Sequence, residues 1–471
     1  MSFIIFLPAI LLFLMSFKKI HQNKKIFPLV TLSLVAPALW MFSIGLPYHL
    51  WDDYLVIDKL GFYVFVISSI VSIGVSLSLL TIHKHVNITQ KGERRFYRFF
   101  ALFWIGLILA TLSNNMGIYW IGLEFATLST VYMIKINDSS TAHKEAWNYM
   151  LVGAVGISLI LFGIILIYAS AKPILGEDAI YFDALLKSAN HIHSPFLFEL
   201  GFAITTLGLF IKMGFFPMNL WLANIERAAF YPVAALFSGI LESVLIIGFF
   251  RFSQIAMSVN YSHIFTYIFI YMMLTIFIVS FLIYRAKDFI RLFTLSGIEH
   301  MALIILFWVS GGKFAALLHF AAHAFLKPAL FLSTGVLESQ GKYHTQGTLR
   351  GYIDKKGKLF AFIVSFFILA IISLPPSPMF FSELYGFSAM IHVAKTGEHP
   401  IIIIVSIFFL LLLLSVIFYR FILLYQAMNY EGVDEKKEVD RMEVLVCVLF
   451  AMALVSLGTP WVLTFIQGVA S

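Results

Sequence analysis

Nine ionisable side chains lie inside strongly apolar stretches of this sequence, where few charges are expected. They are Glu124, Lys212, Glu242, Glu299, His300, His319, His323, Lys327 and Glu383. An ionisable group inside a membrane costs several kcal/mol, so such residues are functional candidates by default. Carboxylates, imidazoles and amines can take up and release protons, so the set predicts a proton pathway. The alternative for Glu242 and Glu299 is a place near the membrane surface.

His319, His323 and Lys327 are spaced at i, i+4 and i+8. On a helix this spacing puts all three on one face, about 6 Å apart along the axis. With waters between them, such a face favours stepwise proton movement, whereas hydrogen bonding between helices is the structural alternative. Two histidines at i, i+4 can also bind a metal. No carboxylate or cysteine is close in sequence, so we predict no metal site.

Prolines accompany three of these charges. Pro217 follows Lys212 by five residues, Pro328 follows Lys327 directly, and Glu383 comes five residues after Pro378. A proline frees a backbone carbonyl and loosens a helix, which can admit water beside a buried charge. Proline-broken helices in corresponding halves of a membrane protein indicate a transport site.

Glu124 is flanked by apolar residues, and Lys212 is its candidate partner. A cation nearby keeps a buried carboxylate charged. If the two side chains separate and rejoin, the lysine can load and release a proton.

The composition indicates which elements position these residues. Hydrophobic residues make up 61% of the 471 and charged residues 12%, with a net charge of +7. Soluble domains are about 25% charged, so the solvent for most of this chain is lipid. The single cysteine, Cys447, excludes an internal disulfide, a cysteine-ligated iron–sulfur cluster and a redox CxxC motif. The sequence also contains no glycine-rich nucleotide-binding motif, so we predict no cofactor in this chain. The energy for transport must then come from an ion gradient or from partner proteins.

Fourteen apolar segments are candidate membrane spans of roughly 20 residues. They are 2–16, 27–46, 60–82, 98–113, 115–135, 147–169, 197–217, 230–252, 263–284, 292–310, 314–337, 358–393, 399–424 and 443–466. We therefore predict an all-α polytopic membrane protein with about 14 transmembrane helices in a single membrane domain, 1–471. Prolines 375, 376 and 378 divide the twelfth segment into two half-helices. Two inverted five-helix repeats, 97–252 and 263–424, would carry Lys212 and Glu383 on their proline-broken fourth helices.

The distribution of basic residues predicts the orientation. With the N-terminus outside, 23 of the 32 Lys and Arg residues fall in inside loops and six in outside loops. Basic residues favour the cytoplasmic side. We therefore expect an integral protein of the bacterial inner (cytoplasmic) membrane with both termini outside. Asp52, Asp53 and Asp58 then lie outside.

Several strings of the sequence, together with the buried charges, resemble the antiporter-like membrane subunits. That family includes the proton-pumping chains 2, 4 and 5 of respiratory complex I, the large Mrp cation/proton antiporter subunits and hydrogenase-4 component F, which is the most similar. The strings are Glu145–Tyr149, Pro232–Gly239, Ser296–Met301, His323–Phe331, Leu374–Pro376 and Phe381–Glu383.

The resemblance implies a proton-translocating subunit of an oxidoreductase complex, either an NADH:quinone oxidoreductase or a hydrogenase-4 type, driven by partner subunits. Glu124 and Lys212 would form the pair of the first half-channel. Lys327 with His319 and His323 would form the central relay, and Glu383 the exit group. Glu242, Glu299 and His300 would be accessory.

Two positions depart from the family pattern. Ser243, after Glu242, stands where the family often has lysine, and Asn219 lies where a histidine usually precedes Trp221. The first departure interrupts the series of lysines. Two alternatives therefore stay open. One is a secondary cation/proton antiporter or an ion-coupled bicarbonate-uptake subunit, and the other is a structural module without conduction. Partners would be other membrane and peripheral subunits, protons or monovalent cations, and lipid, with no nucleic acid.

Overall fold

The computed structural model describes residues 2–15, 17, 26–82, 89–135, 140–189, 195–259, 262–339, 358–396, 400–428 and 440–470. Within these residues the chain is almost entirely helical, and it forms two compact units. Unit 1 comprises residues 1–69, 88–221 and 240–267. Unit 2 comprises residues 70–87, 222–239 and 268–471.

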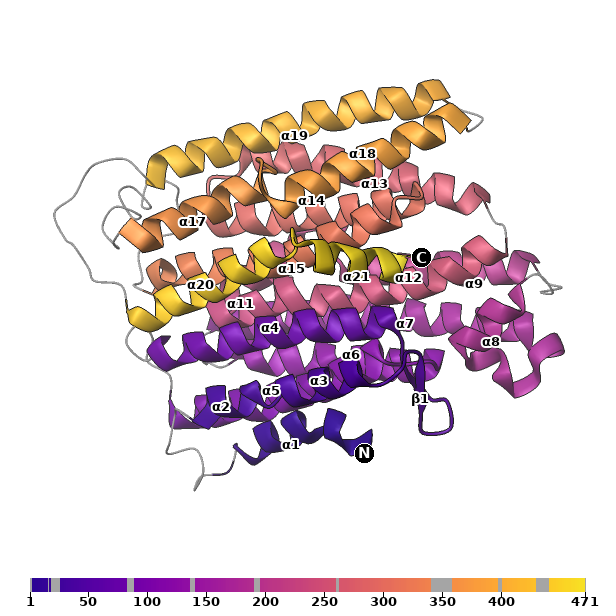
Figure 1. Cartoon of the computed structure of the whole chain (residues 1–471), viewed down its shortest axis with the longest axis horizontal. Helices are drawn as coiled ribbons and strands as arrows, with labels where there is room; N and C mark the ends of the chain where they lie inside the picture. The colour runs from indigo at the N-terminus through magenta and orange to yellow at the C-terminus, as the bar shows by residue number, and fades with distance from the viewer. Residues whose placement is uncertain are drawn as a thin grey trace. The chain divides into compact units, whose positions relative to one another are not determined.

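The described residues up to 258 form twelve α-helices and one short hairpin of two antiparallel strands, most of which are labelled in Figure 1. They are α1 (Leu7–Leu14), α2 (Ile26–Leu32), α3 (Val35–Ser43), β1 (Tyr48–Leu50), β2 (Leu55–Ile57), α4 (Lys59–Ile82), α5 (Gln90–Thr111), α6 (Met116–Ile134), α7 (Ser140–Leu175), α8 (Phe182–Lys187), α9 (Pro195–Lys212), α10 (Leu220–Ala228), α11 (Tyr231–Leu236) and α12 (Glu242–Ser258). A π-helical turn, Phe237–Leu241, joins α11 to α12.

In the described part of residues 262–470, every regular element is a helix. They are α13 (Ser262–Arg285), α14 (Phe289–Val309), α15 (Lys313–Ser339), α17 (Lys358–Ile371), α18 (Pro378–Thr396), α19 (Pro400–Met428), α20 (Arg441–Ser456) and α21 (Pro460–Ala470).

Eight helical segments of the described residues are long and apolar enough to cross a membrane. They are Lys59–Thr81, Met116–Ile134, Ser140–Ile180, Tyr231–Ser258, His263–Arg285, Phe289–Val309, Lys313–Gly335 and Ile403–Gln426. Helices α20 and α21, bent by 66°, add a ninth if they are counted as one span. The all-α membrane class is therefore confirmed, whereas the number fourteen and the two inverted repeats stay predictions.

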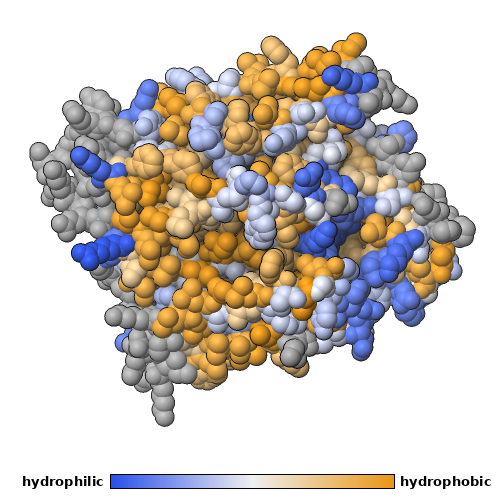
Figure 2. Space-filling model, viewed as in Figure 1, coloured by the Kyte–Doolittle hydropathy of each residue, from blue (hydrophilic) through white to orange (hydrophobic). Residues whose placement is uncertain are grey.

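Apolar side chains cover the surface as well as the interior. Phe162 in α7, Phe281 in α13 and Phe408 in α19 are 50%, 52% and 74% exposed. Figure 2 shows a broad hydrophobic expanse on the face in view. In contrast, the apolar window of α15 is entirely buried. Exposed apolar side chains on some helices and full burial of another are what a membrane-embedded chain requires.

Two helices are broken where the sequence predicts it. Helix α9 ends at Lys212, and α10 starts only after a turn in which Gly214 has a φ of +73°. Such a left-handed conformation favours glycine. Helix α17 ends at Ile371, and α18 begins at Pro378. Figure 1 shows α17 and α18 as two separate helices. The prediction that prolines divide segment 358–393 is confirmed. Pro328, by contrast, lies inside the continuous helix α15.

Glycines allow α7 and α9 of unit 1 to pack closely. A Cβ added to Gly163 would lie 2.5 Å from the main-chain oxygen of Gly201, and one added to Gly208 would lie 2.6 Å from that of Gly156. Small residues at helix interfaces allow such backbone contact in membrane proteins. The close packing places the C-terminal end of α9, where Lys212 lies, against α7.

Much of the charge count that predicts the orientation falls outside the described residues, including Lys18, Lys24, Lys84 and the loop 340–357. Within unit 1, Arg251 and Asp58 do form an ion pair of 3.1 Å, and the count assigns both to the same side.

Candidate functional site

Two histidines from neighbouring helices face each other inside unit 2. His300 in α14 and His319 in α15 are 2% and 0% exposed, and His300 Nδ1 lies 3.1 Å from His319 Nε2. His319 Nδ1 lies 2.8 Å from Ser382 Oγ in α18. The Ser382 hydroxyl donates its single proton to the main-chain oxygen of Met379, so it accepts from His319 Nδ1–H. The Nε2 lone pair of His319 therefore faces His300, and one proton lies between the rings.

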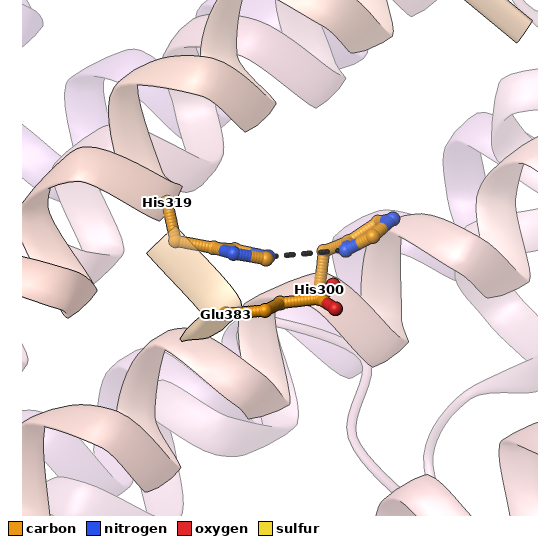
Figure 3. A group of neighbouring side chains, drawn as sticks. All are labelled: His300, His319 and Glu383. Atoms are coloured by element: carbon orange, nitrogen blue, oxygen red, sulfur yellow. Dashed lines mark hydrogen bonds between the residues drawn. The ribbon is translucent and has the colours of Figure 1, made fainter. Parts of the chain in front are cut away.

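Glu383 brings a carboxylate to the same place. It lies on α18, is 9% exposed, and accepts a hydrogen bond from the hydroxyl of Ser373. Ser373 belongs to the break between α17 and α18, so the proline-rich segment positions the partner of this acid. The side chains of His300, His319 and Glu383 converge, with one donor atom of each within 4.8 Å of the others (Figure 3).

Lys327 lies about two turns beyond His319 on α15 and is fully buried. Its ammonium donates a hydrogen bond to the main-chain oxygen of Phe293 in α14 and lies 5.3 Å from the centre of the Phe331 ring. Gly297 leaves room for it, because a Cβ there would lie 3.1 Å from Lys327 Nζ. The lysine charge is thus held inside the protein against α14.

His323 lies on α15 between His319 and Lys327. It is 2% exposed, and the centre of its ring lies 5.9 Å from that of His300. Because α15 is continuous from Lys313 to Ser339, the three groups occupy one helical face, as their spacing predicts.

Two further carboxylates of unit 2 are buried close to this row. Glu226 in α10, 2% exposed, accepts a hydrogen bond from the Thr294 hydroxyl and interacts electrostatically with Lys327. Glu299 in α14 is fully buried, and neither of its carboxylate oxygens has a hydrogen-bond partner among the described residues. Its Oε2 lies 3.9 Å from His300 Nε2. Glu299 is thus enclosed by protein, and the predicted alternative of a place near the membrane surface stays untested.

A second set of charges occupies unit 1. Lys212, 6% exposed, is the last residue of α9, where the carbonyl end of the helix dipole favours a cation. Within the described part of the chain its Nζ makes no hydrogen bond. The charge of Glu124, a half-buried residue of α6, nevertheless acts on the ammonium. Among the described residues, the predicted partners therefore interact electrostatically without forming a salt bridge.

The stem of Lys212 lies against two glycines of α7. A Cβ on Gly156 would approach Lys212 Cγ to 2.7 Å, whereas a Cβ on Gly153 would keep an ordinary 3.8 Å from Nζ. Gly156 therefore provides the space that the buried lysine occupies.

Hydroxyl groups lie near this pair. Tyr149 Oη in α7 lies 3.2 Å from Thr130 Oγ1 in α6, and the charge of Glu124 acts on the phenol. The Tyr149 ring stacks on Trp221 with centres 5.1 Å apart.

Glu242 is also buried in unit 1, at the start of α12 directly after the π-helical turn. The alternative of a place near the membrane surface stays untested for Glu242 too.

Several of these groups carry little signal in the sequence. Glu226 lies beside Arg227, which the charge count places in a loop, so only its place on a short amphipathic helix could have indicated burial. Tyr149 is the last residue of one of the quoted strings. Ser373 and Ser382 carry no signal of their own, because only the folded chain brings them to Glu383 and His319.

Comparison with known families decides the classification. Residues 113–409, more than half of the chain, match the family described as NADH:quinone oxidoreductase/Mrp antiporter, transmembrane. The chain belongs to this family. The matched segment includes every group of the two sets described above, from Glu124 to Glu383.

Individual relatives agree with the family. A hydrogenase-4 component F homolog from Methylacidiphilum infernorum is 30% identical over 310 residues, which cover 64% of each chain. The match therefore spans less than two thirds of that relative. NADH-quinone oxidoreductase subunit N of Bacillus anthracis is 23% identical over 79% of this chain and 74% of its own. The resemblance to antiporter-like subunits is confirmed.

The fold is shared with solved structures of membrane complexes. A chain of the membrane-bound sulfane sulfur reductase, an archaeal respiratory membrane complex, superimposes with a TM-score of 0.82 over 100% of this chain and 96% of its own, at 19% identity. This likeness concerns the fold alone. Together with the family, it makes the chain an integral membrane protein of the antiporter-like type.

Proposed function

We propose that this antiporter-like subunit translocates protons in a multisubunit membrane complex whose other subunits carry out electron transfer. The observation that carries the proposal is the buried row of titratable groups in unit 2, from Lys327 through His323, His319 and His300 to Glu383. Each member of this row is at most 9% exposed, and the His300–His319 pair is already in hydrogen-bond contact.

In this row each group has a distinct role. Lys327 loads a proton next to Glu226. The carboxylate of Glu226, which accepts a hydrogen bond from Thr294, can stabilise the ammonium. The histidines pass a proton along one face of α15, since each ring can accept at one nitrogen and release at the other. Glu383, the most exposed member, receives the proton, and the hydroxyl of Ser373 holds its carboxylate in place.

In unit 1, Glu124 and Lys212 form a separate switch. When Glu124 is close, its charge favours the protonated lysine, and when it withdraws, the desolvated ammonium is destabilised and releases its proton. Gly156 and the end of α9 fix the lysine, so the carboxylate is the movable partner.

The chain has no redox cofactor in this proposal, so its energy comes from partner subunits. Its relatives are named as components of hydrogenase-4 and of NADH-quinone oxidoreductase, and we propose a partner complex of one of these two kinds. It would lie in a bacterial cytoplasmic membrane with both termini outside, spanning it about fourteen times in two inverted repeats, 97–252 and 263–424. The family description also names Mrp antiporters, which makes cation/proton antiport the second candidate.

The test begins with the native complex, extracted in mild detergent through a tag on this chain. Co-purification of a hydrogenase or quinone-reductase arm supports the proposal, whereas small antiporter subunits alone support the second candidate. When the electron donor is added, the lumen of inverted vesicles that carry the complex should then become acidic. The chain reconstituted alone should oxidise no NADH, quinol or hydrogen, and electron transfer by the isolated chain would overturn the proposal.

A further inference from the structure

The three converging side chains in Figure 3 form a set of donors that transition metals use. Two imidazoles and one carboxylate, from α14, α15 and α18, each place a donor atom within 4.8 Å of the other two. Two histidines and a carboxylate are a common ligand set for Zn²⁺, with a fourth position for water. The carboxylate is remote in sequence, so the i, i+4 histidine spacing alone does not reveal the set.

We propose that His300, His319 and Glu383 bind one divalent transition-metal ion, for which Zn²⁺ is the test ion. The histidine pair has the required spacing. Two nitrogens that each lie about 2.0–2.1 Å from one tetrahedral zinc are roughly 3.3 Å apart, and His300 Nδ1 and His319 Nε2 are 3.1 Å apart. The metal takes the place of the proton that lies between the rings. An oxygen of Glu383 lies within 4.8 Å of both ligand nitrogens, so it would move closer to bond the ion.

The protonation pattern of His319 suits a metal ligand. Its Nδ1–H is committed to the Ser382 hydroxyl, which itself donates to the oxygen of Met379. The lone pair of Nε2 is consequently directed towards His300. Metal-bound histidines almost always donate their second ring N–H to such an outer partner, which fixes the tautomer.

Glu299 supplies the matching partner for His300. When Nδ1 of His300 binds a metal, its proton moves to Nε2, and that atom lies 3.9 Å from Glu299 Oε2. This carboxylate is fully buried and its oxygens accept no hydrogen bond within the described residues. A carboxylate–histidine–metal arrangement would use it. Ser373 supports Glu383 in the same manner. His319 and Glu383 thus already have outer hydrogen-bond partners, and the Glu299 carboxylate lies close enough to His300 to become the third.

Binding also compensates charge. Glu299 and Glu383 are two carboxylates that act on each other electrostatically in a buried place, and a divalent cation bound by one of them offsets both. Because the ion replaces the shared proton, a loaded site cannot pass that proton. This consequence rests on the proposed function, whereas metal binding itself does not.

The experiment measures binding without transport, so its failure is distinct from failure of the proposed function. The complex, carried on a tag without histidine, is stripped with a chelator and dialysed against Zn²⁺ alone, and bound zinc is counted per chain. Co²⁺ is added in parallel to record the absorption of tetrahedral cobalt. The wild type should hold one ion that His319→Gln and Glu383→Gln lose. His323→Gln is the matched control, a buried histidine one turn away on the same helix, and it should keep the ion.

Ser382→Ala provides a graded test, because it removes only the outer partner of His319. Loss of such a partner weakens metal affinity about 10–100-fold, so Zn²⁺ should still bind, but at higher concentration. The proposal is overturned if the wild type binds no Zn²⁺ and shows no tetrahedral Co²⁺ absorption. It is equally overturned if His319→Gln and Glu383→Gln retain as much zinc as His323→Gln. The wild-type measurement needs no variant, so misfolding of a variant cannot hide this outcome.

Discussion

His300 Nδ1 and His319 Nε2 lie 3.1 Å apart in the buried interior of unit 2, joined by one hydrogen bond between helices α14 and α15. The hydrogen bond to Ser382 places the ring proton of His319 on Nδ1, the nitrogen that faces away from His300. The proposed relay runs from His319 to His300, so His300 must first release its Nδ1 proton, and His319 must then present a protonated nitrogen to it. The pair can move protons in one direction only after the rings or the hydroxyl reorient.

This geometry predicts that Ser382 affects the rate of transfer as well as the placement of His319. Ser382→Ala removes the acceptor of the Nδ1 proton, so proton uptake by vesicles carrying the complex should fall. The loss should be smaller than for His319→Gln, which removes the relay group itself. Ser406, a serine of α19 outside the row, provides the control Ser406→Ala. Equal rates for Ser382→Ala and wild type would exclude the hydroxyl from the relay.

The structure predicts that Glu226, which is not among the candidates found in the sequence, takes part in proton transport. Glu226→Gln keeps the shape but removes the charge that acts on Lys327. Uptake should fall by on the order of 10²-fold if the carboxylate stabilises the loaded lysine, which is the lower range for loss of an acid–base group. Thr294→Val should cause a smaller loss, because it removes one hydrogen bond to the carboxylate.

The control for these changes is Thr334→Val. Among the described residues its hydroxyl bonds only to the main-chain oxygen of Leu330 within α15, so transport should be unaffected. If Glu226→Gln transports as fast as Thr334→Val while both assemble, Glu226 has no part in the relay.

Gly156 and Gly153 form a matched pair for the site in unit 1. Gly156→Ala places a methyl group 2.7 Å from Lys212 Cγ and 3.0 Å from the oxygen of Gly208, so the lysine stem must move. Gly153→Ala makes ordinary contacts at 3.7 and 3.8 Å. We expect proton uptake to fall only for Gly156→Ala, with assembly of both verified by native gel electrophoresis. Similar rates for the two variants would show that the position of Lys212 is not critical.

The ion pair of Arg251 and Asp58 predicts an effect on stability. Arg251, 5% exposed, donates to both carboxylate oxygens of Asp58 and to the main-chain oxygens of Thr111 and Ser113. Arg251→Ala should destabilise unit 1 by about 2–3 kcal/mol, below the range for a fully buried pair because Asp58 is 35% exposed. The measurement is the thermal unfolding of the purified chain.

The comparison variant is Lys187→Ala. This lysine pairs with Asp183 at 3.4 Å and is 77% exposed. Exposed pairs contribute little, so its unfolding temperature should match the wild type. An Arg251→Ala protein that unfolds at the same temperature as Lys187→Ala would contradict the structural role of the buried pair.

The orientation is tested by cysteine labelling in intact cells. Because basic residues favour the cytoplasmic side, labels near residues 90, 290 and 350 should be protected and a label near residue 180 accessible. Residues 90 and 180 on the same side would contradict the fourteen-span arrangement.

The sequence predicts a large part of this account because lipid makes charge conspicuous. Lys212, Lys327 and Glu383 stand out as charges in apolar segments, and the structure buries all three. The breaks at Pro217 and at Pro375–Pro376 follow from chemistry that acts locally in the chain, and both are confirmed. These features depend on residues close to one another in sequence.

The contacts between distant residues could not be predicted in this way. Nothing local indicates that His319 meets His300 and Ser382, because those contacts depend on how three helices pack. The i, i+4, i+8 spacing correctly orders the groups along α15, but it does not show that the second histidine of the pair comes from α14. Likewise, Glu226 looks like part of a charged loop until α10 is seen to bury it against Thr294.

The central claim is that protons pass through the buried charges, and proton uptake by inverted vesicles carrying the assembled complex tests it most directly. Three variants are compared with wild type: Lys212→Arg, which keeps the charge but cannot release its proton at working pH, Lys327→Ala, and Glu383→Gln. The account predicts that all three assemble and that each transports protons on the order of 10²-fold more slowly, while Glu383→Asp retains part of the flux. Assembly of all three with uptake at the wild-type rate would contradict the claim and leave the chain as a structural module of its complex.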